Sequence, residues 1–441
     1  MFELPPQVQY VLDKLNNAGF EAYLVGGGVR DALMGFAPKD FDITTSALPE
    51  QTEQVFAEHR LIETGMKHGT VTALIDDMPL EITTYRIDGE YSDNRHPDKV
   101  SFTSCLKDDL SRRDFTVNAL ACHPLSGITD LFDGQTDIAN QIIRCVGTPV
   151  ERFREDALRI LRALRFSSVL GFSIDPATAD AIHAESGLLK NVSAERIYSE
   201  FVKLLCGKNA RRVLDDYIDV IGVFIPQVLS MQNCPQNCVY HCFDVLHHTT
   251  ASVEAAPAEP AMRLAAFFHD IGKPACRTTD EAGNDHFYGH CAVSAEIADQ
   301  VLKELRAETK TVQTVTQLVL HHDTPISETE KSVKRAMNKL TAEGFYMMLD
   351  LKRADTLAHA SACHERLSVL DNLKAIADEV IRKQDCFSLR QLAVNGDDLI
   401  ALGMVPGKKI GDRLHWLLDA VVDGKVENEK QLLLDYLENH E

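Results

Sequence analysis

The apolar positions of the chain follow two different patterns, which change near residue 145. Residues 4–18 place Val8, Val11, Leu12 and Leu15 at the spacing of one face of an amphipathic helix. Beyond residue 20, alternating or β-branched runs indicate strands at 41–45, 70–76, 79–87 and 99–104. From about residue 146 onward the pattern is almost entirely helical. The pattern therefore predicts an α/β domain with a mixed sheet, followed by an all-helical region.

Two breaks subdivide the helical region. Residues 228–242 (VLSMQNCPQNCVYHC) and residues 255–260 (AAPAEP) interrupt the helical periodicity. No internal repeat or low-complexity tract accompanies them. We therefore expect four parts, which span residues 1–145, 146–227, 228–379 and 380–441.

A glycine-rich turn and two aspartates stand together near the start of the chain, in YLVGGGVRDALMGFAPKDFDITT (23–45). Asp40 and Asp42 are two residues apart in a predicted strand, so both side chains point to one face. Two carboxylates on one face can hold Mg²⁺, and the glycines let the backbone approach a triphosphate. Either feature alone is common on ordinary turns and strand ends. Their combination indicates nucleotidyl transfer.

Two arginine-containing segments extend this picture. RRDFTVNAL (112–120) supplies Arg113, whose guanidinium can clamp phosphate or sugar oxygens. EDALRILRALRF (155–166) is predicted to be one helix with a buried apolar stripe. On its other half, Asp156 and Arg159 would present an acceptor and a donor in one plane, which suits the edge of a base. An ordinary salt bridge on a solvated face is the alternative interpretation.

Composition limits the class of protein. The chain has 441 residues, of which 45% are apolar and 25% charged, as expected for a soluble globular protein with several domains. Eleven scattered cysteines, no signal peptide and no apolar stretch long enough to span a membrane predict a cytoplasmic protein with reduced thiols. A net charge of −21 argues against nucleic-acid binding, but arginines crowd residues 144–165, so charge does not settle the partner.

The motifs match one family in order and spacing. GGGVRD with DFD, RRD, LFDGQTDI (131–138), EDALR and SAERIYSEF (193–201) resemble the five motifs of the class II tRNA nucleotidyltransferases, the CCA-adding enzymes. The C-terminal LAVNGDDLI and DGKVENEKQLLLDYL resemble the end of bacterial members. The resemblance implies a polymerase-β-like catalytic head, a helical neck, a helical metal domain and a tRNA-binding tail. It also implies template-independent addition of CCA to tRNA from CTP and ATP.

The resemblance also assigns residues. It implies that Asp40 and Asp42 bind Mg²⁺ and are catalytic. It implies nucleotide contacts by Gly27, Arg30 and Arg113, with base reading by Asp156 and Arg159 supported by Arg162 and Arg165. Glu81 and Asp114 are both candidates for a third catalytic carboxylate.

Close relatives of this family compete for the assignment. Poly(A) polymerases share the first motif, but the following segment ETGMKHGTVT (63–72) resembles the CCA-adding form. CC-adding enzymes lack a flexible loop that IDGEYSDNRHPDKV (87–100), with Tyr91, Arg95 and Pro97, resembles. The sequence does not exclude an enzyme that adds only A.

The helical region carries a second set of candidate ligands. HDIGK (269–273) is preceded by DVLHHT (244–249) and followed by distant histidines and KRADTLAH (352–359). Imidazoles and carboxylates on facing helices are typical ligands of transition metals. The spacing resembles the HD phosphohydrolases, which implies a second divalent transition metal on His248, His269, Asp270 and Asp355. The resemblance places four further residues near phosphate or another metal, namely Lys273, His290, His321 and His322.

Two other classes of function remain as alternatives. The chain could be a phosphohydrolase with a vestigial nucleotidyltransferase head, or an RNA-binding scaffold without turnover. The complete set of head motifs speaks against the first, and the two sets of metal ligands speak against the second.

Overall fold

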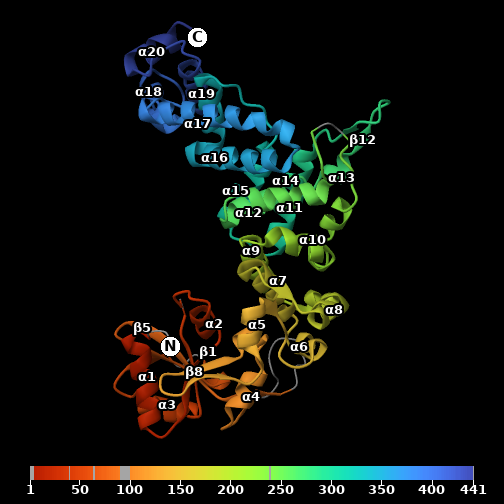
Figure 1. Cartoon of the computed structure of the whole chain (residues 1–441). Helices are drawn as coiled ribbons and strands as arrows, with labels where there is room; N and C mark the ends of the chain where they lie inside the picture. Colours follow the sequence, from red (N-terminus) through yellow and green to blue (C-terminus); the bar gives the residue numbers. More distant parts are fainter. Residues whose placement is uncertain (1–3, 39, 63–64, 90–99, 238–239, 441) are drawn as a thin grey trace. The chain divides into compact units, whose positions relative to one another are not determined.

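A computed structural model describes residues 4–38, 40–62, 65–89, 100–237 and 240–440. It divides the chain into two compact units, residues 1–226 and 227–441. Unit 1 contains a seven-stranded sheet and unit 2 is almost wholly helical (Figure 1). The predicted α/β region followed by a helical region is therefore confirmed.

The sheet of unit 1 is mixed, as predicted. Its strands are, in spatial order, β3 (Arg60–Ile62), β4 (Thr70–Ile75), β5 (Met78–Thr84), β2 (Asp42–Thr45), β1 (Ala22–Val25), β8 (Leu120–His123) and β9 (Gly127–Asp130). The β2–β5 pair is parallel and the other pairs are antiparallel. Small pairs join β6 (Arg86–Asp88) to β7 (Val100–Phe102) and β10 (Ile142–Ile143) to β11 (Ser173–Ile174).

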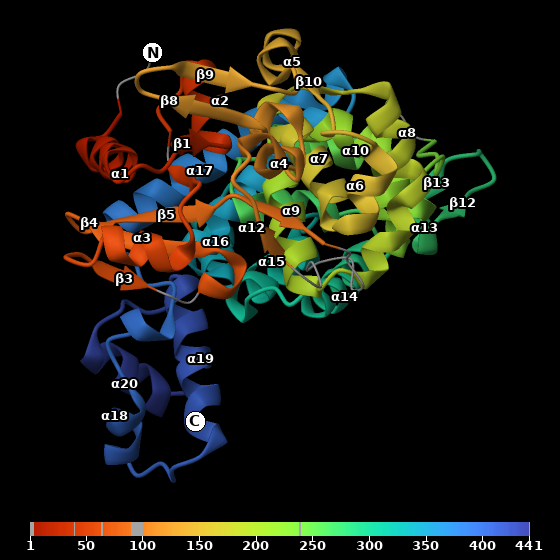
Figure 2. The same ribbon diagram turned by 90° about the horizontal axis from the view of Figure 1, so that it is seen from below.

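One face of the sheet is buried beneath helices. The helices of the sheet region are α1 (Pro6–Asn17), α2 (Gly27–Leu33), α3 (Pro49–Val55), α4 (Leu106–Ser111) and α5 (Gly134–Asn140). The predicted stripe of α1, from Val8 to Leu15, is completely buried against this sheet together with Leu24, Ile43 and Phe56. Figure 2 shows α1 and α3 beside the strands they cover. Asp40 and Asp42, at the start of β2, are exposed and lie outside this core.

A second group of helices completes unit 1. These helices are α6 (Pro149–Glu155), α7 (Leu158–Leu170), α8 (Pro176–Glu185), α9 (Ala194–Leu205) and α10 (Ala210–Ile221). The prediction of one helix over 155–166 is wrong at its first turn. Asp156 has an extended backbone (φ −134°, ψ 102°) that ends α6, and α7 begins at Leu158.

Unit 2 is a helical unit with one short β pair. Its helices are α11 (Val245–Ala255), α12 (Pro260–Phe268), α13 (Lys273–Cys276), α14 (His290–Glu304), α15 (Thr309–His321), α16 (Glu330–Ala358), α17 (Arg366–Arg382), α18 (Gly396–Ala401), α19 (Lys408–Val422) and α20 (Lys430–Glu438). The β pair joins β12 (Thr278–Thr279) to β13 (Asp285–His286). The last three helices share a separate apolar cluster that includes Leu399, Leu417 and Leu433.

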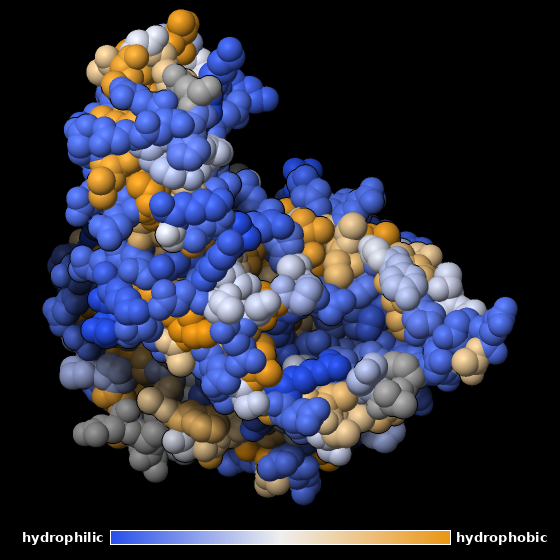
Figure 3. Space-filling model, turned by 90° about the horizontal axis from the view of Figure 1, so that it is seen from above, coloured by the Kyte–Doolittle hydropathy of each residue, from blue (hydrophilic) through white to orange (hydrophobic). Residues whose placement is uncertain are grey.

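The surface agrees with the acidic, charge-rich composition. In Figure 3, hydrophilic residues cover most of the face that is visible, and apolar residues form small separate groups. Within the described ranges, no helix combines the length and the apolarity that a transmembrane span requires.

Candidate functional site

Two glycines allow the turn after β1 to pack closely against Asp40 and Asp42. Gly26 has φ 75°, and a Cβ there would lie 2.9 Å from Nη1 of Arg113 and 3.7 Å from Oδ2 of Asp42. A Cβ at Gly28 would lie 2.7 Å from the carbonyl oxygen of Asp40. Any side chain at these two positions would therefore displace Arg113 or the Asp40 backbone. The glycine-rich turn, the aspartates and Arg113 form one tightly packed group.

The register of the sheet adds Glu81 to this group. Asp42 and Glu81 are partners on the parallel strands β2 and β5, so their side chains leave the same face. Asp40 directly precedes β2 rather than lying within it. Partial burial raises the pKa of Asp42 above its ordinary value; Arg113 opposes this rise and the charge of Asp40 adds to it. A cavity of about 190 Å³ is lined by Asp42, Glu81 and Arg113, among others.

Asp114, the other candidate carboxylate, is already engaged. Its Oδ2 accepts hydrogen bonds of 2.8 and 2.6 Å from Nε and Nη2 of Arg162, and its Oδ1 accepts one from Asn118. Burial raises the pKa of Asp114, but Arg162 and Asn118 outweigh it and lower the pKa to about 2. The carboxylate of Asp114 is therefore paired with Arg162 of α7, whereas Glu81 lines the cavity.

Three guanidinium groups surround the ring of Phe166. Arg30, Arg162 and Arg165 lie 5.2, 5.4 and 4.0 Å from the ring centroid. Arg30 also donates to Asp31 and, at 2.7 Å, to Asn118. Burial lowers the pKa of the Arg165 guanidinium, and Glu200 opposes this shift. Arginines from two separate sequence motifs thus meet around one aromatic residue. The periodicity of the sequence does not predict this contact.

The side chains of Asp156 and Arg159 have different partners, although the backbone N–H of Arg159 donates to the carbonyl of Asp156 at 3.0 Å. Nη2 of Arg196, on α9, donates to both carboxylate oxygens of Asp156 at 3.3 and 3.0 Å. Arg159 is buried and donates to Glu155 at 2.6 Å and to the carbonyl of Arg112 at 2.8 Å. The break at Asp156 turns its carboxylate toward α9, which explains why the predicted coplanar pair on one helical surface is absent. Arg196 and Glu155 were missed because their roles depend on this break.

The arginine-rich segment is not an uncompensated basic stripe. Its arginines pair with carboxylates as follows: Arg144 with Asp137 and Asp175, Arg152 and Arg159 with Glu155, Arg154 with Glu185, Arg162 with Asp114, and Arg165 with Glu200. Most of these partners come from distant positions in the sequence.

The second set of predicted ligands converges in unit 2. Nε2 of His248 lies 3.4 Å from Nε2 of His269, and Oδ2 of Asp270 lies 3.4 and 3.1 Å from these two nitrogens. Oδ1 of Asp355 lies 2.9 Å from Nε2 of His248. The four predicted ligands, from α11, the α12–α13 turn and α16, therefore meet at one point. His359 adds a further imidazole beside Asp355, and the sequence did not single it out.

The carboxylate of Asp270 is a buried anion in this cluster. It is 1% exposed, and neither of its oxygens has a hydrogen bond of good geometry within the part of the chain that the structure describes. Lys273 lies 2.7 Å from Oδ2 and also donates to Gln236. Burial raises the pKa of Asp270, yet His269 and Lys273 hold it well below the ordinary value. A buried carboxylate surrounded by imidazole nitrogens fits a bound cation.

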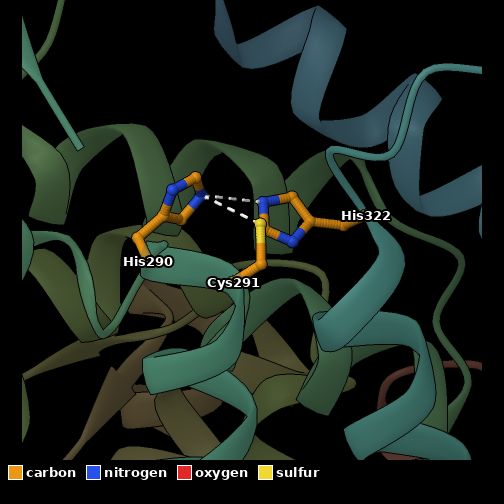
Figure 4. A group of neighbouring side chains, drawn as sticks. All are labelled: His290, Cys291 and His322. Carbon is orange, nitrogen blue, oxygen red and sulfur yellow. Dashed lines mark hydrogen bonds between the residues drawn. The ribbon is translucent and has the colours of Figure 1, made fainter. Parts of the chain in front are cut away.

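The cluster continues on the other side of Asp270. Nε2 of His290 and Nε2 of His322 lie 3.4 and 3.7 Å from Oδ1 of Asp270. Cys291 lies beside both histidines (Figure 4) and was not considered from the sequence, although it directly follows His290. His321 is not part of any of the three candidate ligand groups found within the described residues. At least one member of each group lines a cavity of about 560 Å³, whereas His248 and His269 lie behind its wall.

Two predictions fall partly outside the described residues. The segment 87–100 includes residues 90–99, and with them Tyr91, Arg95 and Pro97, about which the structure says nothing. The segment 63–72 lacks residues 63–64. All ten described cysteines are free thiols.

Family models match three stretches of the chain. Residues 22–144 match the poly A polymerase head domain, and residues 171–220 match the probable RNA and SrmB-binding site of polymerase A. Residues 286–437 match the putative tRNA nucleotidyltransferase domain 2. Together these matches extend over both units.

Similar proteins cover nearly the whole chain. A CCA-adding enzyme of Enterococcus faecalis is 35% identical over 430 residues, which are 97% of this chain and 94% of that protein. One from Lactobacillus delbrueckii subsp. bulgaricus is 36% identical over 443 residues, 99% of this chain and 98% of its own. The structure of the Bacillus stearothermophilus CCA-adding enzyme with CTP has a TM-score of 0.75 at 29% identity, and the match covers 99% of this chain and 98% of that one. The Thermotoga maritima CCA-adding enzyme complexed with tRNA shares the fold, with a TM-score of 0.57 at 21% identity over 99% of this chain and 97% of that one.

Proposed function

Because this chain belongs to the family of CCA-adding enzymes, we propose that it adds and repairs the 3′-terminal CCA of tRNA, using CTP and ATP and releasing pyrophosphate. The observation that carries this proposal is the group of Asp40, Asp42 and Glu81 beside Arg113, in a chain similar to such enzymes over 97% of its length. The ten free cysteines support a cytoplasmic setting.

Carboxylate oxygens are the donors that Mg²⁺ prefers, so the Asp40, Asp42 and Glu81 group fits this ion. Mg²⁺ held there would neutralise the charge that develops on the phosphate oxygens during transfer. In the reaction, the 3′-hydroxyl of the RNA attacks the α-phosphorus. The new oxygen–phosphorus bond forms as the bond to pyrophosphate breaks, and the hydroxyl proton leaves to solvent.

We assign the triphosphate to the arginines nearby. Arg113 lies partly buried next to Asp42, and its buried Nε has no hydrogen-bond partner among the described residues. A buried donor without a partner fits an anionic ligand oxygen. Arg30, Arg162 and Arg165 around Phe166 supply three more cations, and Gly27 starts the helix that carries Arg30. These arginines would hold and orient the triphosphate without taking part in bond breaking.

Base choice is assigned to Asp156 and Arg159. Their present partners, Arg196 and Glu155, hold the acceptor and donor in fixed places near the start of α7. Side chains of this kind can replace a nucleic-acid template, because they offer a base the same types of hydrogen bond.

The test is nucleotide addition to a tRNA transcript that lacks CCA, with the 3′ ends sequenced after reaction in CTP alone, ATP alone and both. We expect CC with CTP alone and CCA with both. Addition of A only to a CC-ending transcript would make the protein an A-adding enzyme. Long A tails would assign it to the poly(A) polymerases.

A matched pair of variants tests the third carboxylate. Glu81→Gln is expected to reduce addition about a hundredfold or more, since it removes a charge beside the reacting phosphate. Asp114→Asn is expected to keep more activity, because Asp114 holds Arg162 instead of facing the cavity. The reverse ranking would reassign the role to Asp114.

A second function is favoured by the cluster in unit 2. We propose that His248, His269, Asp270 and Asp355 hold a divalent transition metal, and that this site hydrolyses phosphoesters. Such a metal would polarise a phosphoryl oxygen, while the nearby ammonium of Lys273 could hold the phosphate. Metal analysis of the purified protein and hydrolysis of a chromogenic phosphodiester test the two parts separately. A protein that binds metal without hydrolysis would keep only the first part.

A further inference from the structure

The cavity beside Asp42 has a wall on the β5 side that the proposed binding of triphosphate does not use. This wall contains Thr70 on β4, Glu81 and Thr83 on β5, and Arg86 on β6. Glu81 and Thr83 are two residues apart on one strand, so both side chains leave the same face of the sheet as Asp42. Thr70 is the register partner of Thr83, and their hydroxyl oxygens lie 3.0 Å apart. Two hydroxyls and one guanidinium therefore lie beyond the carboxylates.

Arg86 is positioned at this wall by a contact with the backbone. Its Nη1 donates a hydrogen bond to the carbonyl oxygen of His68, the last residue of η1 (Met66–His68). The following residue, Gly69, has φ 85°, a left-handed conformation that favours glycine. The amide of Thr84, at the end of β5, donates to the carbonyl of Gly69 at 2.8 Å. The η1 turn and β5 thus place a guanidinium, a donor suited to phosphate oxygens, at the wall of the cavity.

The order of the strands puts the β5 wall on the other side of Asp42 from the glycine-rich turn. Strand β2 lies between β1 and β5 in the sheet. The turn after β1 and the guanidinium of Arg113 pack against Asp42 on one flank, to which the triphosphate is assigned. Glu81 and Arg86 belong to the other flank, because β6 follows β5 directly along the chain. The carboxylates therefore lie between two groups of side chains that can bind phosphate.

An in-line displacement needs its two substrates on opposite sides of the reacting phosphorus. The attacking hydroxyl and the departing pyrophosphate lie roughly in line through the α-phosphorus. If the triphosphate lies on the flank of Arg113, the hydroxyl arrives from the flank of Glu81 and Arg86. The RNA end that carries this hydroxyl also carries a phosphodiester, whose negative charge is repelled by Glu81. A cation on this flank offsets the repulsion, and Arg86 supplies one.

We propose that Arg86 is a positioning residue for the acceptor RNA, which binds the phosphodiester of the 3′-terminal nucleotide. The hydroxyls of Thr70 and Thr83 complete the contact, since each can donate to a phosphate or ribose oxygen. This assignment rests on the proposed nucleotide addition and extends it, because the arginines named above bind the other substrate. Arg86 also lies outside the five motifs of the sequence.

Steady-state kinetics of the full-length protein separates the two substrates. A transcript that ends in CC is extended with ATP, and the KM for each substrate is measured in the wild type and in Arg86→Gln. We expect the KM for RNA to rise about tenfold or more, as for loss of a hydrogen bond to a charged group. The KM for ATP should stay within about twofold, and Arg86→Lys should restore part of the loss, because its ammonium still pairs with phosphate. A rise in the KM for ATP alone would overturn the proposal.

Two further variants provide a control and a graded effect. Arg60→Gln is the control, because Arg60 is exposed on β3 of the same sheet and lies outside the cavity wall formed by the described residues. Both of its KM values should match the wild type. Thr83→Val keeps the shape of the side chain and removes its hydroxyl, so the KM for RNA should rise about threefold. Thermal unfolding shows that each variant is folded, and an equal rise in Arg60→Gln and Arg86→Gln would refute the assignment.

A modified RNA tests the contact itself. A neutral methylphosphonate in place of the terminal phosphodiester removes the charge that Arg86 is proposed to bind. Equilibrium binding should weaken about tenfold in the wild type and by less than about twofold in Arg86→Gln, because the partner is already absent there. Equal losses in the two proteins would contradict the proposal. Binding is measured without triphosphate, so a protein that shows this difference yet adds no nucleotide would overturn the proposed function and leave the contact in place.

Discussion

The acidic group of unit 1 and the imidazole cluster of unit 2 are both candidate metal sites, but they are built differently. Asp40 and Asp42 are two residues apart at the start of a strand, where Asp42 and Glu81 line a cavity together with arginines such as Arg113. His248 and Asp355 are 107 residues apart, and the fully buried His248 meets Asp355 at the wall of the cavity of unit 2. The carboxylates of the first site are exposed, whereas His248, His269 and Asp270 of the second site are buried.

The contrast teaches what each kind of site demands of the chain. An exposed carboxylate site needs few neighbours. A local motif supplies Asp40 and Asp42, and the pairing of β2 with β5 adds Glu81. A buried site must compensate every charge it contains, so its histidines need backbone partners and its aspartate needs cations. Enclosure suits tight retention of an ion, and openness suits exchange of substrate.

The largest expected effect comes from the open site. Asp42→Ala should reduce nucleotide addition at least about a thousandfold, since it removes a carboxylate beside the reacting phosphate. RNA binding and the metal content of unit 2 should stay unchanged. Addition assays and elemental analysis measure both, with Asp13→Ala on the exposed side of α1 as the control. Nucleotide addition that persists in Asp42→Ala would contradict the assignment of Asp42 as a metal ligand.

The converse change should separate the two sites. His269→Ala combined with Asp270→Ala removes ligands of the enclosed site, so bound metal and phosphoester hydrolysis should fall about a hundredfold or more. Addition of CCA should stay within about twofold if the first site acts without the second, as the lack of shared ligands suggests. Parallel assays of both activities on one preparation make the comparison, and a joint loss in folded protein would show that the sites are coupled.

A smaller effect is expected at the start of α7. Asp156→Ala combined with Arg159→Ala should cost about 1–3 kcal/mol of discrimination between bases, the range for a good bidentate contact. The KM for triphosphate should change less, because other arginines are assigned to the phosphates. Sequencing of the 3′ ends in mixed nucleotides gives the result. Unchanged order of C and A in this variant would exclude the base-reading role.

The smallest effect concerns stability within unit 1. The pKa of Asp114 is about 2, below its ordinary value of 3.8, so its charge stabilises the fold above about pH 4 and this contribution is lost as pH falls toward 2. Asp114→Asn should lower the stability around α7 by about 2 kcal/mol at neutral pH. Hydrogen exchange at the amides of α7 measures this difference, which should shrink near pH 3. A difference that does not change with pH would assign the effect to packing.

The sequence predicted the elements well and the contacts less well. The stripe from Val8 to Leu15 and the strand at Asp42 follow from periodicity, which the structure confirms. The break at Asp156 could not be read, because no proline or glycine marks it and it is held by contacts with Arg196 from another helix.

The same limit applies to the sites. The predicted ligands of unit 2 do converge, whereas the function of both sites stays a prediction. The pairing of Asp42 with Glu81 depends on strand register, which the sequence leaves open. The contact of Cys291 with His322 depends on how α14 and α15 pack, so spacing alone could not reveal it.

The paired arginines of residues 144–165 have a consequence for how RNA approaches. Each already has a carboxylate neighbour, so together they add little to the long-range electric field of a chain with net charge −21. Long-range attraction toward a polyanion is weak under these conditions. Binding to RNA should therefore weaken with rising ionic strength less steeply than the number of arginines suggests, since few counterions are released at this segment.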